Sequence, residues 1–168
     1  FDIFVTETFL PLLKGLTIVL ADSDDQKDPA ALNRLILDQG VDLMQITPSH
    51  LSLLLNGESD EFLKSLQAIM VGGEAFPLEL FKELSDNFAG KIYNMYGPTE
   101  TTVWSTIQEL TGRSAINIGT PIRNTTTYVL DKNHKLQPIG VPGELCIGGD
   151  GLARGYWKRE DLTNEKFI

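Results

Sequence analysis

The alternation of strand-like and helix-like segments over about residues 6–104 is the feature that most limits how this chain can fold. Apolar runs at Leu16–Leu20 and Val41–Ile46 predict buried strands, and Leu32 and Ile36 between them recur at helical spacing. Strands and helices that alternate in this way form a mainly parallel sheet with helices on its faces. We therefore predict an α/β fold with a mainly parallel sheet flanked by helices.

The same pattern continues along this part of the chain. The further predicted elements are a helical stretch at Leu10–Leu13 that Gly15 ends, a helix opened by Pro48 and running through Leu55, a strand at Leu66–Val71, a helix from Pro77 to Phe88 and a strand at Lys91–Tyr96.

The sequence pattern changes after about residue 110, where helical periodicity is replaced by short β-rich runs separated by turns. Thr126–Leu130 and Glu144–Ile147 are the two clearest of these runs. They predict part of a small antiparallel β-subdomain over residues 111–168, following an α/β subdomain over residues 1–110.

Charge and composition exclude several kinds of partner. The net charge of −9 would repel nucleic acid and an anionic membrane surface, and no apolar run approaches the length of a membrane helix. The single cysteine, Cys146, excludes an internal disulfide and a thiolate zinc site, and it fits a cytoplasmic location.

Two loops that follow predicted strands are the first candidates for chemistry, because ligands of open α/β sheets bind at the carboxyl ends of strands. In the first loop, the paired glycines Gly72 and Gly73 precede Glu74 and allow a flat group to approach the backbone. A tight turn explains these glycines equally well, and taken alone it is the favoured interpretation.

The second loop, Asn94–Thr102, brings an aromatic ring, hydroxyls and a carboxylate into nine residues. Tyr96 can stack on a base and Asn94 can hydrogen-bond an adenine amino group, while Thr99 can contact a phosphate and Glu100 can hold magnesium. A β-turn with hydroxyl caps on a short helix is the alternative, and the loop alone does not decide between them.

A third segment, Gly143–Trp157, is a strand that leads into a glycine-rich turn. No lysine–hydroxyl pair follows the glycines, so the segment is not a phosphate loop. We interpret most of its glycines as β-hairpin geometry.

Together these segments resemble the adenylation domains of nonribosomal peptide synthetases, within the acyl-adenylate-forming superfamily. NMYGPTET at Asn94–Thr101 and GELCIGGDGLARGYW at Gly143–Trp157 match two family motifs in order, and Phe1-Asp2 begins a third, although Phe4 stands where the family usually has serine. The upstream phosphate loop, the downstream TGD motif and the C-terminal lysine of the family are absent from this sequence. We therefore expect an internal fragment that is inactive by itself.

The resemblance implies ATP and Mg²⁺ as cofactors and assigns the nucleotide contacts residue by residue. Asn94 and Tyr96 would bind adenine, Thr99 would approach the α-phosphate, and Glu100 would coordinate magnesium. Thr99 and Glu100 are thus the expected catalytic residues. The expected nucleotide-binding set is Gly72, Gly73, Glu74, Asn94, Tyr96, Gly97 and Thr99.

The resemblance also implies an amino-acid substrate, whose ammonium group would pair with Asp2, and an assembly line with condensation and phosphopantetheine-bearing carrier domains. The expected substrate pocket is Asp2, Ile3, Thr6, Gln45, Met70, Gly72, Met95, Val103 and Trp104. Most of these side chains are bulky, so volume favours glycine first and alanine second. Thr6 and Gln45 are the counterargument, since both can hydrogen-bond a polar substrate.

Two other functions remain open at this point. An acyl- or aryl-CoA ligase relative would share the adenine loop but would have no reason to keep a carboxylate at Asp2. A non-catalytic nucleotide-binding module would tolerate the loss of Glu100.

Overall fold

The computed structural model describes residues 2–57 and 59–168. Its α-helices are α1 (Phe4–Leu13), α2 (Pro29–Gln39), α3 (Pro48–Leu55), α4 (Leu78–Asn87) and α5 (Glu160–Lys166), and its short 3₁₀ helices are η1 (Asp25–Lys27), η2 (Glu61–Lys64) and η3 (Thr99–Thr101). Its strands are β1 (Leu43–Ile46), β2 (Ala68–Gly72), β3 (Lys91–Tyr96), β4 (Thr106–Glu109), β5 (Thr120–Pro121), β6 (Thr125–Leu130) and β7 (Glu144–Gly149).

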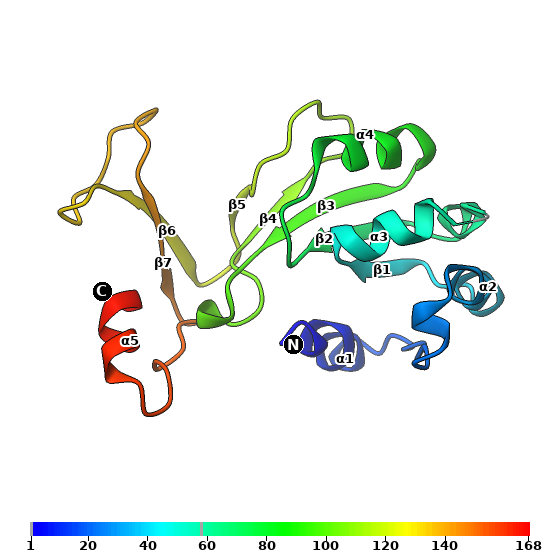
Figure 1. Cartoon of the computed structure of the whole chain (residues 1–168), viewed down its shortest axis with the longest axis horizontal. Coiled ribbons are helices and arrows are strands. Elements are labelled where there is room, and N and C mark those ends of the chain that lie inside the picture. The colour runs from blue at the N-terminus through cyan, green and yellow to red at the C-terminus, as the bar shows by residue number, and fades with distance from the viewer. Residues whose placement is uncertain (1, 58) are drawn as a thin grey trace.

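The main sheet has the strand order β1-β2-β3-β4-β5. The first three strands are parallel, and β4 and β5 add to them in antiparallel fashion. β6 and β7 form a separate antiparallel pair, which projects away from the main sheet beside α5 (Figure 1). The predicted fold class is therefore confirmed, while the division near residue 111 stays a prediction.

The main sheet has two different faces, which decides where a site can lie. Ile69 and Val71 of β2 are fully buried in a core that includes Leu51 of α3 and Leu84 of α4. Because side chains alternate along a strand, Met70 and Gly72 point to the opposite face. That second face is the one on which α1 contacts Gln45 of β1.

Local sequence signals account for the helix ends. The carboxylate of Asp28 accepts a hydrogen bond from the backbone N–H of Ala30 at 2.9 Å and caps α2, which ends at the left-handed Gly40. Thr47 caps α3 in the same way through the backbone N–H of His50, and Pro48 occupies the first turn. The predicted bounds of α3 are confirmed.

One predicted strand is wrong. Leu16–Leu20 has no regular structure, and Leu20 is largely exposed. An apolar run becomes a strand only when a neighbouring strand supplies hydrogen bonds, and the edge strand β1 pairs only with β2 among the described residues. The strands β4 and β5 and the helix α5 were not predicted.

Among the helices of residues 2–57 and 59–168, none combines the length and the apolar character required to cross a bilayer.

Candidate functional site

The parallel strands β1, β2 and β3 place most of the predicted substrate pocket on one face of the sheet. Gln45 is in register with Met70, and Gly72 is in register with Met95. Neighbours in register share a face, and Met70 and Gly72 are two residues apart on one strand, so all four lie on the same side.

Gln45 holds two other predicted pocket residues in place. Its Oε1 accepts hydrogen bonds from the hydroxyl of Thr6 on α1 at 2.9 Å and from the indole N–H of Trp104 at 3.1 Å. Its Nε2 donates to the carboxylate of Glu7 at 3.2 Å. Gln45 is therefore already engaged by the protein on both ends of its amide group.

Trp104 fills the space in front of Gly72. A Cβ atom at Gly72 would lie 2.6 Å from the Trp104 ring and 2.6 Å from the carbonyl oxygen of Met95. Glycine is thus required at this position so that the ring can lie against the strand. Ile3 contributes from the other side, since its Cδ1 lies against Gly73, and Val103 is buried.

The chain reaches this position through a strained turn after β3. Thr102 and Val103 are β-branched, yet their φ angles are 63° and 68°. Such residues rarely adopt this region, and the conformation costs about 1–3 kcal/mol per residue. The backbone of Val103 packs directly on Gly97, where a Cβ would lie 2.4 Å from the Val103 carbonyl oxygen. These two left-handed residues reverse the chain direction, so that the Trp104 ring lies against Gly72 of β2.

The predicted nucleotide residues Asn94, Tyr96 and Thr99 lie at the end of β3 and in the turn after it, and they differ in exposure. Tyr96 is 37% exposed, and Thr99 is also exposed. Asn94 is buried on the helix-covered face, and its Nδ2 donates to the carbonyl of Asn117 at 2.8 Å. That bond leaves the Oδ1 atom and the second Nδ2 hydrogen of Asn94 uncommitted, and the adenine contact of Asn94 stays a prediction.

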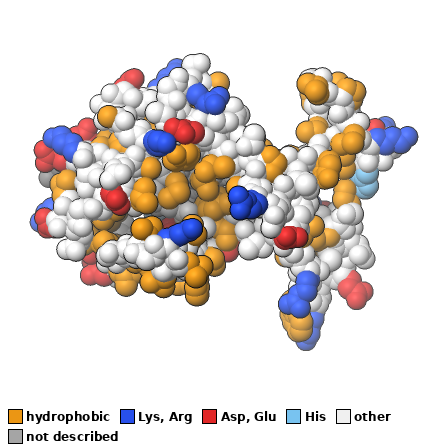
Figure 2. Space-filling view, turned by 180° about the vertical axis from the view of Figure 1, so that it is seen from behind, with side chains coloured by type: hydrophobic (Ala, Val, Ile, Leu, Met, Phe, Trp, Pro, Cys, Tyr) orange, Lys and Arg blue, Asp and Glu red, His pale blue; other side chains and the backbone are white. Residues whose placement is uncertain are grey.

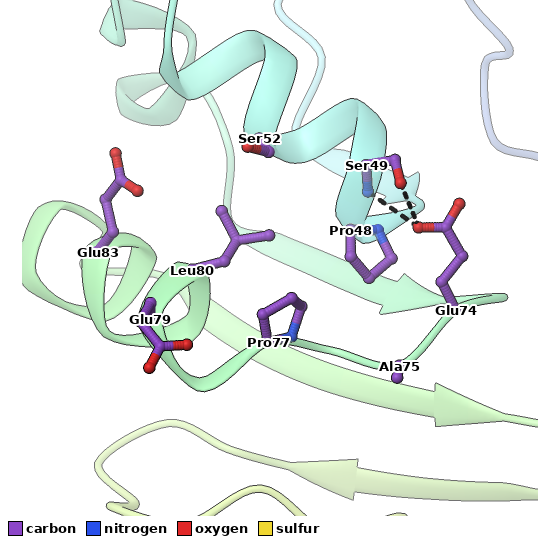
Figure 3. Close-up of a pocket in the computed structure, with 9 residues that line it drawn as sticks. All are labelled: Pro48, Ser49, Ser52, Glu74, Ala75, Pro77, Glu79, Leu80 and Glu83. Atoms are coloured by element: carbon purple, nitrogen blue, oxygen red, sulfur yellow. Dashed lines mark hydrogen bonds between the residues drawn. The ribbon is translucent and has the colours of Figure 1, made fainter.

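Glu74 contacts the N-terminal end of α3. Its carboxylate accepts hydrogen bonds from the backbone N–H of Ser49 at 3.1 Å and from the Ser49 hydroxyl at 2.5 Å, at the start of α3. Figure 3 shows these residues beside a surface pocket of about 470 Å³ between α3 and α4. A carboxylate at a helix N-terminus stabilises that helix, so Glu74 has a structural role whether or not it also lines an adenine site.

Two carboxylates near the carboxyl ends of the strands, Asp2 and Glu100, are candidates for binding a ligand. The Oδ2 atom of Asp2 is buried and has no hydrogen-bond partner among the described residues. The pKa of Glu100 is lowered, first by a hydrogen bond from the Tyr156 hydroxyl, and the negative charge of Asp2 acts against this. The two groups are therefore close enough to interact, and Glu100 is ionised at neutral pH.

The residues present fit a magnesium site in which the protein supplies one carboxylate and bound phosphates and water supply the other ligands. Across residues 2–57 and 59–168, no three His, Cys, Asp or Glu side chains come together as a metal site. Mg²⁺ is commonly bound by one or two carboxylates together with substrate phosphates and water, and the ionised, partly exposed Glu100 matches that pattern.

Two residues at the site were missed from the sequence. Glu7 was not singled out, although it bonds Gln45, because a charged residue on a helix usually faces solvent. Tyr156 was included in the Gly143–Trp157 motif without a role of its own, yet its hydroxyl bonds Glu100. The available sequence signal was the position of Tyr156 directly after the glycines of this segment.

Taken together, the fold and this edge define the class: an α/β domain in which the predicted nucleotide loop and the predicted substrate pocket meet at the carboxyl ends of parallel strands. A family model described as AMP-binding enzyme matches residues 1–157, and the chain belongs to this family. Within the family it is part of an adenylation domain of the kind found in nonribosomal peptide synthetases.

The curated relatives support this placement over the whole chain. Tyrocidine synthase 3 of Brevibacillus parabrevis is 45% identical and matches 100% of this chain, which spans 3% of that protein. The dimodular nonribosomal peptide synthase of Bacillus subtilis (strain 168) is 44% identical, again over 100% of this chain and 7% of its own length. The chain thus spans a small part of these relatives.

Solved structures agree. A four-domain nonribosomal peptide synthetase, whose crystal structure contains AMP and glycine, is 38% identical with a TM-score of 0.91, and the match covers 100% of this chain and 13% of that one. An NRPS protein containing adenylation and PCP domains is 29% identical with a TM-score of 0.86, covering 100% of this chain and 35% of that one.

Proposed function

We propose that the protein containing this chain is an ATP-dependent enzyme that activates an amino acid as aminoacyl-AMP and transfers it to a phosphopantetheine carrier. The observation that carries the proposal is the buried Oδ2 atom of Asp2, which has no hydrogen-bond partner among residues 2–57 and 59–168 and lies within range of the charge of the ionised Glu100. A buried carboxylate is costly unless it is paired, and the ammonium group of an amino acid is a matching partner.

The chemistry has two steps. In the first, a carboxylate oxygen of the amino acid attacks the α-phosphorus of ATP, and pyrophosphate leaves. In the second, the carrier thiol attacks the acyl carbon, a thioester forms, and AMP leaves with the bonding electrons. Bound magnesium would neutralise charge on the phosphates during the first step.

The residues of this chain would hold and orient the reactants. Asp2 anchors the substrate ammonium, Tyr96 offers its exposed ring to the base, and Thr99 donates its hydroxyl to the α-phosphate. Glu100 supplies the carboxylate for magnesium. No side chain of this chain is required as a nucleophile.

The pocket supports a small substrate, with glycine preferred to alanine. The Trp104 ring already occupies the space at Gly72, and Ile3 closes the side next to Gly73. Gln45 is bonded to Thr6, Trp104 and Glu7, so its amide is engaged by the protein rather than available for a polar substrate. The related synthetase with glycine in its structure is consistent with this choice.

Amino-acid-dependent exchange of pyrophosphate into ATP by the full-length protein tests the proposal. We expect exchange with glycine, weaker exchange with alanine, and little with larger amino acids. Exchange driven only by an aryl or fatty acid would instead identify an acyl- or aryl-CoA ligase.

Two variants separate catalysis from mere nucleotide binding. Asp2→Ala should raise the KM for the amino acid strongly while ATP binding is retained, because only the ammonium contact is removed. Glu100→Ala should greatly reduce exchange, whereas a non-catalytic nucleotide-binding module would show no exchange in either form. The carrier and condensation partners and the cytoplasmic location belong to the same proposal.

A further inference from the structure

The glycine-rich segment after β7 is fixed to the η3 turn, although the two are about fifty residues apart in the sequence. The backbone N–H of Ala153 donates to the carbonyl oxygen of Glu100 at 2.7 Å. The hydroxyl of Thr102 donates to the carbonyl oxygen of Gly151 at 2.6 Å. These bonds hold the segment against both ends of the turn that carries Glu100.

Tyr156 extends this contact from backbone to side chain. Its hydroxyl donates a hydrogen bond to Oε1 of Glu100. Because Oε1 is engaged, rotation of the carboxylate is restricted and the direction of Oε2 is set.

The helix α5 in turn holds Tyr156. The backbone N–H of Tyr156 donates to the hydroxyl of Thr163 at 2.9 Å, and its ring meets Phe167 edge to face with centroids 5.8 Å apart. Thr163 and Phe167 therefore hold Tyr156 in place, and Tyr156 in turn holds the carboxylate of Glu100.

The bond also acts on the charge of Glu100. Its pKa is lowered chiefly by the Tyr156 hydroxyl, while the pKa of Tyr156 is raised by the same bond. The charge of Lys166 on α5 also lowers the pKa of Glu100, and the negative charge of Asp2, which precedes α1, acts against it. The hydroxyl thus favours the charged form that binds a divalent cation.

We propose that Tyr156 is a positioning residue that fixes the Glu100 carboxylate in the orientation in which it takes a magnesium ion bound with ATP. This inference rests on the proposed function, because it assumes that Glu100 is the metal-binding carboxylate. It extends the site to the Gly143–Trp157 segment, a family motif to which the sequence had assigned no contact with the nucleotide site.

The test is Tyr156→Phe in the full-length protein, with Mn²⁺ as the probe ion. Phenylalanine keeps the ring packed on Phe167 and removes only the hydroxyl. Free Mn²⁺ measured by electron paramagnetic resonance in the presence of ATP should show about tenfold weaker binding, since loss of a group that orients a metal ligand costs 10–100-fold in affinity. Tyr128→Phe, on the exposed face of β6, is the matched control and should bind Mn²⁺ as the unmodified protein does.

Equal Mn²⁺ affinity of Tyr156→Phe and the unmodified protein would overturn the proposal. Loss of folding in Tyr156→Phe would overturn it too, because the hydroxyl would then be structural.

Glu100→Gln distinguishes failure of this inference from failure of the proposed function. If Glu100→Gln leaves Mn²⁺ binding unchanged, the metal role of Glu100 fails, and the Tyr156 inference fails with it. If Glu100→Gln weakens binding and Tyr156→Phe does not, only the inference fails. If the inference is right, adding Tyr156→Phe to Glu100→Gln causes no further loss, since the two residues act as one unit.

Discussion

At the scale of single residues, the most informative side chain is Trp104, because the ring that packs against the sheet is also the one proposed to limit substrate size. Its indole N–H bonds Gln45, and its ring takes the place of a side chain at Gly72. Bulky residues at these positions predicted a small substrate from the sequence. The structure adds that Gln45, which had argued for a polar substrate, is bonded within the protein.

Trp104→Leu should shift the substrate preference towards larger amino acids. The leucine side chain is shorter than the indole, so space opens beside Gly72 and the hydrogen bond to Gln45 is lost. We expect the ratio of kcat/KM for leucine or valine to that for glycine to rise by about 10–100-fold, measured by pyrophosphate exchange in the full-length protein.

Trp157→Leu is the matched control, because Trp157 is 87% exposed and makes no contact with the pocket residues among the interactions described. Its substrate preference should equal that of the unmodified protein. A folded Trp104→Leu protein that still prefers glycine to the same degree would contradict the assignment of Trp104 as the residue limiting substrate size.

At the scale of elements, the sequence predicted those segments whose signals are local. α3 begins at Pro48 and β3 covers Lys91–Tyr96 as predicted, since proline, capping side chains and an apolar run all lie within the segment itself. β4 and β5 escaped prediction because they are four and two residues long, and only pairing with β3 and with each other defines them. α5 was not predicted because it is only seven residues long and has no side-chain cap.

Asp28→Ala should destabilise the domain through α2 alone. The Asp28 carboxylate accepts a hydrogen bond from the Ala30 backbone N–H, and an alanine at a helix N-cap costs about 1 kcal/mol. Urea unfolding of the adenylation domain should show a lower free energy of unfolding with an unchanged m-value.

Asp24→Ala provides the comparison for this experiment. Asp24 is exposed and precedes η1 without a side-chain capping bond, so its removal should change the free energy of unfolding by no more than about 0.5 kcal/mol. Equal effects of the two substitutions would show that charge, rather than the cap at Asp28, is responsible.

At the scale of the whole molecule, the hydrophobic core lies around the main sheet, whereas many apolar side chains near the start of the chain are exposed. Hydrophobic side chains gather on the larger part of the molecule in Figure 2. The exposed large apolar residues of α1 and the following segment are Phe4, Val5, Phe9, Leu10, Leu12, Leu13, Leu16 and Leu20. A concentration of exposed apolar side chains in one segment usually marks a surface that packs against a partner or another part of the protein.

The isolated chain of 168 residues should therefore bind a hydrophobic dye, self-associate, and form no aminoacyl-AMP. The family's phosphate loop, TGD motif and C-terminal lysine are not in this sequence, so ATP would lack most of its contacts. Dye fluorescence, size-exclusion chromatography and a mass-spectrometric assay for aminoacyl-AMP measure these three outcomes. Robust adenylation by the isolated chain would refute the expectation.

The sequence by itself determined the α/β class, the main parallel strands and the loops that carry Tyr96, Glu100 and the pocket residues. Periodicity, helix caps and short motifs are local properties, and the order of the motifs added the family. Only the tertiary structure decided that Leu16–Leu20 forms no strand, that Gln45 is bonded on both sides, and that Tyr156 reaches Glu100. These outcomes depend on which distant segments meet, because hydrogen-bond partners for a strand, an amide or a carboxylate come from elsewhere in the chain.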